Sequence, residues 1–138
     1  MGLNLGDVNW LAVIVATLVA FALGAAWYGV FAGPWMAAIG MNREQIRARS
    51  RENRYAYAVT AVAAFVGMVA VAVFVGAAGA DSLVEGVIVG AVAGVGFVAT
   101  STAAHYVFAF RPMKLYLMDA GYHVVLFAIG GAIVGAWR

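Results

Sequence analysis

The chain has 138 residues, which is room for a single domain. Charged residues make up only 10% of it and hydrophobic residues 66%. This balance excludes a soluble globular protein, whose surface needs roughly a quarter charged residues. There is no cysteine, so disulfides and thiolate metal sites are excluded, and the basic residues lie at the edges of apolar runs, which argues against nucleic acid as a partner.

Four apolar runs are long enough to cross a bilayer, which takes about 20 helical residues at about 1.5 Å per residue. We expect each run to be helical, because backbone groups in lipid must be satisfied within the segment. The predicted fold is an all-α integral membrane four-helix bundle, one transmembrane domain over 1–138. Its predicted spans lie at about 9–31, 55–78, 82–110 and 113–137.

The segment 34–54 separates the first two runs and carries most of the basic charge, in Arg43, Arg47, Arg49, Arg51 and Arg54. Pro34 favours either the end of the first helix or the start of a short interfacial one. Asn42 followed by Gln45 predicts a capping box for a helix through the arginines, which can run on into the second span. Because the arginines would lie on several faces, we expect them to meet solvent or anionic lipid headgroups rather than form one anion site.

The distribution of charge between the loops predicts the orientation. The arginine segment and the third loop, with Arg111 and Lys114, are basic, whereas the N-terminal region and the second loop carry Asp7 and Asp81. The positive-inside rule then places the arginine segment in the cytoplasm and both termini outside. We expect a multi-pass protein of the cytoplasmic (inner) membrane.

Two segments of the chain resemble each other. Residues 25–28 (Ala-Ala-Trp-Tyr), followed by Pro34, match residues 103–106 (Ala-Ala-His-Tyr), followed by Pro112, at a constant offset. Both segments end a helix that crosses from outside to inside. The match predicts a parallel repeat of two helices, related by an axis along the membrane normal, with the arginine segment as an insertion in the first half.

Glycines recur every fourth residue in the last two runs, as Gly86, Gly90 and Gly94 and as Gly131 and Gly135. In lipid, such small residues let helices approach closely. We expect these glycines to pack the bundle internally. The alternative is an interface between copies, and we expect a homo-oligomer that uses whatever glycine face the bundle leaves over.

Asp119 and His123 are the best candidates for chemistry. Their spacing puts them on one helix face, with Asp119 about 9 Å inside the fourth span. An ionisable group at that depth is costly and is a functional hypothesis by default. The pair can relay a proton, coordinate a cation or hold a polar ligand, and His105, Tyr106 and the hydroxyls of 100–102 can contribute from the third span.

A purely structural interpretation competes with that one. Asp119 can pair with a nearby cation (Arg54, Arg111 or Lys114), while His123 bonds to a backbone carbonyl or a hydroxyl. Several aromatic residues near the expected membrane surfaces are typical of an interfacial belt, namely Trp10, Trp27, Tyr28, Tyr57 and Trp137. No nucleophile–base pattern, phosphate loop or zinc motif is present, so we expect no enzyme, no cofactor and no metal site.

Six short motifs together resemble domain of unknown function 1761, a family of small four-helix bacterial membrane proteins. They are residues 9–13 (Asn-Trp-Leu-Ala-Val), 24–28 (Gly-Ala-Ala-Trp-Tyr), 34–36 (Pro-Trp-Met), 114–117 (Lys-Leu-Tyr-Leu), 119–123 (Asp-Ala-Gly-Tyr-His) and 131–135 (Gly-Ala-Ile-Val-Gly). The chain departs from the family where Gly29 and Val30 replace a frequent Ser-Pro. The resemblance implies four helices and no established activity, and it strengthens Asp119 and His123 as candidates. The candidate site also includes Tyr122, which lies between them in the chain.

Two functions are consistent with these features. The first is a small transport or channel-like protein, with Asp119, His123 and His105 at a polar intramembrane site. The second is a structural or accessory protein that binds a larger membrane partner through glycine-lined helix faces. An enzyme acting on lipids is a weaker third, because the chain has few groups that could converge on a catalytic set.

Overall fold

The computed structural model describes residues 4–138, and every regular element in that range is helical. A short 3-10 turn, η1 (Leu5–Asp7), precedes the first long helix. The α-helices are α1 (Trp10–Val30), α2 (Ala32–Ile39), α3 (Arg43–Glu52), α4 (Ala56–Ala77), α5 (Leu83–Ala93), α6 (Thr100–Phe108) and α7 (Met113–Ala136). A π-helical stretch, η2 (Gly94–Ala99), joins α5 and α6 into one continuous rod.

Four of these helices are long and apolar enough to cross a membrane: α1, α4, the rod Leu83–Phe108 and α7. Their ends lie within one or two residues of the predicted spans, so the all-helical fold with four membrane-length helices is confirmed. No polar or charged residue of 4–138 is buried, whereas large apolar side chains cover much of the exterior. An apolar exterior of this kind suits a lipid environment.

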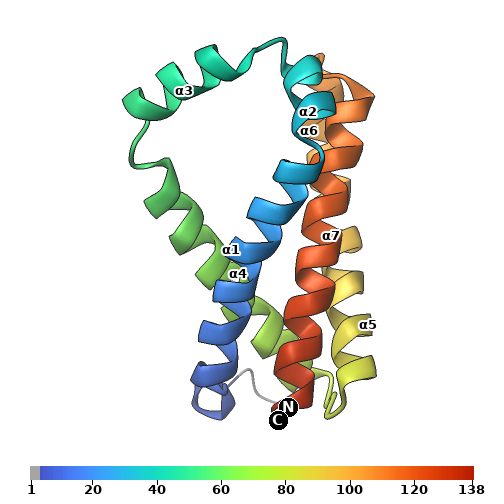
Figure 1. Cartoon of the computed structure of the whole chain (residues 1–138). Helices are drawn as coiled ribbons and strands as arrows, with labels where there is room; N and C mark the ends of the chain where they lie inside the picture. The colour runs from blue at the N-terminus through green and yellow to red at the C-terminus, as the bar shows by residue number, and fades with distance from the viewer. Residues whose placement is uncertain (1–3) are drawn as a thin grey trace.

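The start of α1 and the end of α7 lie at the same end of the bundle, away from α2 and α3 (Figure 1). Asn9 caps α1 by accepting the backbone N–H of Ala12 at 3.1 Å. Its amide nitrogen also donates to the carbonyl oxygen of Trp137 at 2.8 Å. One side chain thus fixes the start of α1 against the end of α7.

The arginine segment forms two short helices. Phe31 separates α1 from α2, and Pro34 lies in the first turn of α2, so the second of its two predicted roles is the one observed. Asn42 and Gln45 make the predicted capping box, with reciprocal hydrogen bonds of 2.9 Å. The continuation of this helix into the second span is wrong: α3 ends at Glu52, and a turn at 53–55 redirects the chain into α4.

The closest helix contact is between α5 and α7. A Cβ at Gly86 would collide with the carbonyl oxygen of Gly131, and one at Gly90 with that of Phe127. At Gly135 it would lie 2.5 Å from the carbonyl oxygen of Ser82. Gly94 packs against the backbone of α7 as well. All five predicted packing glycines therefore lie within one contact inside this chain.

By contrast, α1 and α4 pack together over only part of their length. Four small or medium apolar residues of α1 and four of α4 are buried in the core, namely Ala12, Val13, Ala16, Ala20, Met68, Val71, Ala72 and Val75. No residue of α4 between 56 and 67 is buried, and α4 diverges from α1 towards α3 (Figure 1). The two halves of the chain thus pack differently, and the parallel repeat stays a prediction.

Candidate functional site

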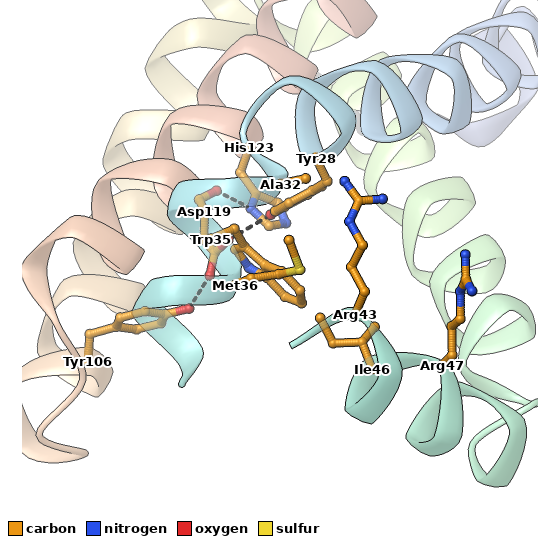
Figure 2. A pocket seen from close by; sticks show the side chains of 10 residues that line it. All are labelled: Tyr28, Ala32, Trp35, Met36, Arg43, Ile46, Arg47, Tyr106, Asp119 and His123. Atoms are coloured by element: carbon orange, nitrogen blue, oxygen red, sulfur yellow. Dashed lines mark hydrogen bonds between the residues drawn. The ribbon is translucent and has the colours of Figure 1, made fainter. Parts of the chain in front are cut away.

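The carboxylate of Asp119 is the centre of the candidate site. Asp119 lies in the second turn of α7 and is partly buried. Its Oδ1 accepts a hydrogen bond from the Tyr28 hydroxyl at 2.8 Å, and its Oδ2 accepts one from the Tyr106 hydroxyl at 2.5 Å (Figure 2). Because Tyr28 comes from α1 and Tyr106 from α6, one carboxylate links three membrane-length helices.

The partners of Asp119 differ from those expected of a structural ion pair. Within residues 4–138 the carboxylate accepts from two tyrosines and bonds to neither Arg111 nor Lys114. Hydroxyl donors are uncharged, so they stabilise a carboxylate without neutralising its charge. Each carboxylate oxygen also keeps a further lone pair that can accept a hydrogen bond. The group therefore retains the capacity to bind a cationic or hydrogen-bond-donating ligand.

His123 lies one turn beyond Asp119 on the same face of α7. Its Nδ1 is 2.8 Å from the backbone carbonyl oxygen of Asp119, and does not contact the carboxylate (Figure 2). A carbonyl oxygen can only accept, so Nδ1 carries the proton of this hydrogen bond. In the neutral imidazole, Nε2 is then the acceptor. A bond to a backbone carbonyl is what the structural interpretation expected of His123. The Asp119 carboxylate and Nε2 of His123 both stay available on one face of α7.

Neighbouring rings hold the two tyrosines in place. Tyr28 packs edge-on against Trp35 at a centroid separation of 5.9 Å and in a tilted arrangement against Tyr122 at 5.3 Å. Tyr106 packs edge-on against Tyr116 at 5.9 Å. The Tyr116 hydroxyl in turn donates to the carbonyl oxygen of Ala99, the last residue of the π-helical stretch, at 3.0 Å. π-helical turns often accompany functional sites, and this one contributes to holding a tyrosine on Asp119.

A cavity of about 580 Å³ opens beside this group. Its size lies within the range of small-molecule sites, about 300–1,000 Å³. Five helices line it, through Tyr28, Ala32, Trp35, Met36, Arg43, Ile46, Arg47, Tyr106, Asp119 and His123. The carboxylate lies on one side and the two arginines of α3 on the other, with Trp35 and Met36 between them and Ile46 beside the arginines (Figure 2).

The arginines of the segment 34–54 are not equivalent. Arg43 and Arg47, one turn apart on α3, line the cavity, whereas Arg49, Arg51 and Arg54 do not. Within residues 4–138, neither of the two makes a hydrogen bond through its guanidinium. The sequence interpretation weighed against one specific anion site, but two of the five arginines share a cavity with Asp119.

Other predicted site residues lie apart from this cavity. His105 is exposed and borders a second hollow of about 260 Å³, which shares Trp35, Tyr106 and Asp119 with the cavity. Tyr122 packs behind Tyr28, and its hydroxyl donates to the carbonyl oxygen of Ala20 at 3.3 Å. The hydroxyls of Thr100 and Ser101 donate to carbonyl oxygens of their own helix, both at 2.6 Å. The structure thus brings Asp119 and His123 to the cavity, and not His105 or Tyr122.

Tyr28 is a site residue that the sequence interpretation assigned to the membrane surface, and Trp35 lines the same cavity. One signal could have found Tyr28: it occupies the same position in the first repeated segment as Tyr106 does in the second. Trp27, also assigned to the surface, instead donates its indole N–H to the carbonyl oxygen of Met118 at 3.1 Å. No group of three or more potential metal ligands among His, Cys, Asp and Glu occurs in the described part of the chain.

These features define an all-helical protein with four membrane-length helices and a charged cavity at its arginine-bearing end. The chain belongs to the family described as protein of unknown function (DUF1761), whose model matches residues 11–135. The resemblance drawn from the sequence motifs is thereby confirmed. No curated protein and no solved structure matches the chain. A function must therefore be argued from the site itself.

Proposed function

We propose that this protein is a small transport or channel-like membrane protein whose polar site is the cavity beside Asp119. One observation carries the proposal: a carboxylate within a membrane-length helix is held by two tyrosine hydroxyls and faces a cavity of about 580 Å³. Ionisable groups in membrane helices are expensive and mark ion and substrate pathways. A structural ion pair would instead have neutralised the charge on a neighbouring cation.

The arrangement also supports a direction of access. The cavity lies at the end of the bundle that carries α2 and α3, opposite the start of α1 and the end of α7 (Figure 1). By the positive-inside rule this end faces the cytoplasm of a cell whose inner membrane holds the protein, with both termini outside. A solute or proton then reaches Asp119 from the cytoplasmic side, past arginines that also attract anionic lipid headgroups.

A binding or conducting role fits the site better than an enzymatic one. Its polar groups are a carboxylate, an imidazole, two phenols and two guanidiniums. The imidazole bonds to a backbone carbonyl and no nucleophile lies within its hydrogen bonds, so the pattern of an activated nucleophile is not formed.

An accessory role, with a larger membrane partner bound through glycine-lined faces, has less support. The glycines that suggested it lie between α5 and α7 of the same chain, where they are occupied by backbone. A homo-oligomer stays a prediction, and its interface would have to use another face. Gly96 lies on such a face, because a side chain added there would meet open space.

Flux through liposomes tests the proposal. Purified protein is reconstituted with a pH-sensitive dye inside, and proton, cation and small-solute gradients are imposed in turn. We expect flux that Asp119→Asn abolishes. Asp81→Asn is the matched control, because it makes the same change at an exposed position in the loop before α5. Wild-type liposomes indistinguishable from those with Asp119→Asn would refute the proposal.

A further inference from the structure

We propose that the cavity binds a compound that carries an amine at one end and a phosphate at the other, the chemistry of phosphoethanolamine and of the ethanolamine phospholipid headgroup. This inference rests on the proposed function and names the class of ligand. Opposite charges lie on separate sides of one cavity, and a different set of side chains lies beside each charge.

The charges of the cavity are arranged for a ligand with two poles. Asp119 lies on one side, and Arg43 and Arg47 lie on the other (Figure 2). The carboxylate is bonded to tyrosine hydroxyls and not to either guanidinium, so the opposite charges of the site do not neutralise each other directly. Arg43 and Arg47 are exposed and Asp119 is partly buried, so a ligand of one sign would pair with only one side of this open cavity. A molecule with both signs satisfies each side.

The Asp119 side suits an amine. Each carboxylate oxygen already accepts one hydrogen bond and has a second acceptor position. In the neutral imidazole, Nε2 of His123 is a further acceptor, because Nδ1 donates to the backbone. The rings of Tyr28, Trp35 and Tyr106 line the same cavity, and aromatic faces attract ammonium groups within about 6 Å.

The arginine side suits a phosphate. Arg43 and Arg47 lie one turn apart on α3 and both line the cavity. Guanidinium groups bind phosphate oxygens in a bidentate, charge-assisted manner, and two of them match a group with several charged oxygens better than a single carboxylate. Met36 lies between the two sides and Ile46 beside the arginines, and both provide apolar surface for the carbon chain that joins amine to phosphate (Figure 2).

The two halves of the ligand provide controls that need no mutation. Calorimetric titration of the detergent-solubilised protein compares phosphoethanolamine with ethanolamine, which has the amine alone, and with glycerol phosphate, which has the phosphate alone. We expect phosphoethanolamine to bind at least tenfold more tightly than either half. Equal affinity for glycerol phosphate and phosphoethanolamine would overturn the proposal. It would also be overturned if none of the three compounds bound and the protein retained no ethanolamine lipid.

The source of the phosphate is settled by a parallel measurement. Protein in nanodiscs of phosphatidylcholine, with and without phosphatidylethanolamine, is released and weighed by native mass spectrometry. Selective retention of the ethanolamine lipid identifies a membrane ligand, whereas binding of free phosphoethanolamine alone identifies a soluble one. Either result supports the amine-phosphate chemistry.

Substitutions test the two sides separately. Asp119→Asn and the double change Arg43→Gln with Arg47→Gln should each weaken binding at least tenfold. Arg51 lies on the same helix outside the cavity, so Arg51→Gln should leave binding unchanged. An equal loss with Arg51→Gln would indicate general attraction to basic charge and would overturn the proposal.

The outcomes for ligand and for transport are separable. Flux that depends on Asp119 without amine-phosphate binding would refute this inference and leave the proposed function standing. Selective binding of the amine-phosphate compound without any flux would support this inference and refute the proposed transport function.

Discussion

Tyr28 and Tyr106 occupy the same position in two matching segments of the sequence, and both donate their hydroxyl groups to Asp119. They approach the carboxylate from different helices and bond to different oxygens. The aspartate thus depends on two tyrosines that are far apart in the chain. This relationship makes the site testable by measurements of coupling between residues, independently of any assay of activity.

Tyr106→Phe should lower the free energy of unfolding by about 1 kcal/mol, because it removes a hydrogen bond to a charged group that is only partly buried. In an Asp119→Asn background the same change should cost much less, since the charge is gone. Unfolding in mixed micelles with denaturing detergent measures both. Tyr57→Phe, on the exposed face of α4, is the control and should have no effect. Strict additivity of the two changes would contradict the coupling.

Gly131→Ala should destabilise the bundle by about 3 kcal/mol, the upper part of the usual range for overpacking, because the new methyl group meets the backbone of α5. Gly96→Ala makes the same change where a side chain meets open space, and should be neutral or slightly stabilising. The same unfolding measurement compares the two. Similar stability for both variants would mean that α5 and α7 do not approach as closely as described.

Asn9→Ala should cost about 2 kcal/mol, since it removes an N-cap and the hydrogen bond to Trp137, each worth about 1 kcal/mol. Asn4→Ala removes a cap from the short turn η1 only and should cost clearly less. Thermal unfolding of the two variants checks the difference. An equal loss would show that the contact between the first and last helices contributes little.

Labelling of single cysteines checks the orientation, because the natural chain has no cysteine. We expect a membrane-impermeant maleimide to label Asp81→Cys in intact cells, and Arg49→Cys only after the membrane is permeabilised. Both positions are exposed, so reactivity reports the side of the membrane. The reverse pattern would place the arginine segment outside and would require the cytoplasmic access route to be abandoned.

Local sequence patterns predicted the fold well and the site only in part. The four long helices follow from apolar length, and the cap formed by Asn42 and Gln45 follows from residues three apart, so both depend on neighbouring positions. The turn at 53–55 was missed because neither Gly nor Pro marks it.

The composition of the cavity depends on contacts between distant elements. The spacing of Asp119 and His123 placed them on one face, but the carboxylate's partners come from α1 and α6. Tyr28 was assigned to the membrane surface because aromatic residues at helix ends are usually interfacial. The orientation of α3 between α2 and α4 decides which arginines line the cavity, and no local sequence pattern predicts that orientation.

The arginine-bearing helix is attached to the rest of the molecule mainly through its two ends. α3 makes only sparse contacts with other helices, and it is joined to α2 by a connection at 40–42 and to α4 by one at 53–55. Gly40, in the left-handed conformation with φ of 69°, ends α2 and sets the direction of the first connection. The distance between the arginines of α3 and the carboxylate of Asp119 is consequently set by the lengths of these two connections and not by core packing. Relatives whose connection at 40–42 or 53–55 differs by one residue would select ligands of a different length while keeping the same charged groups.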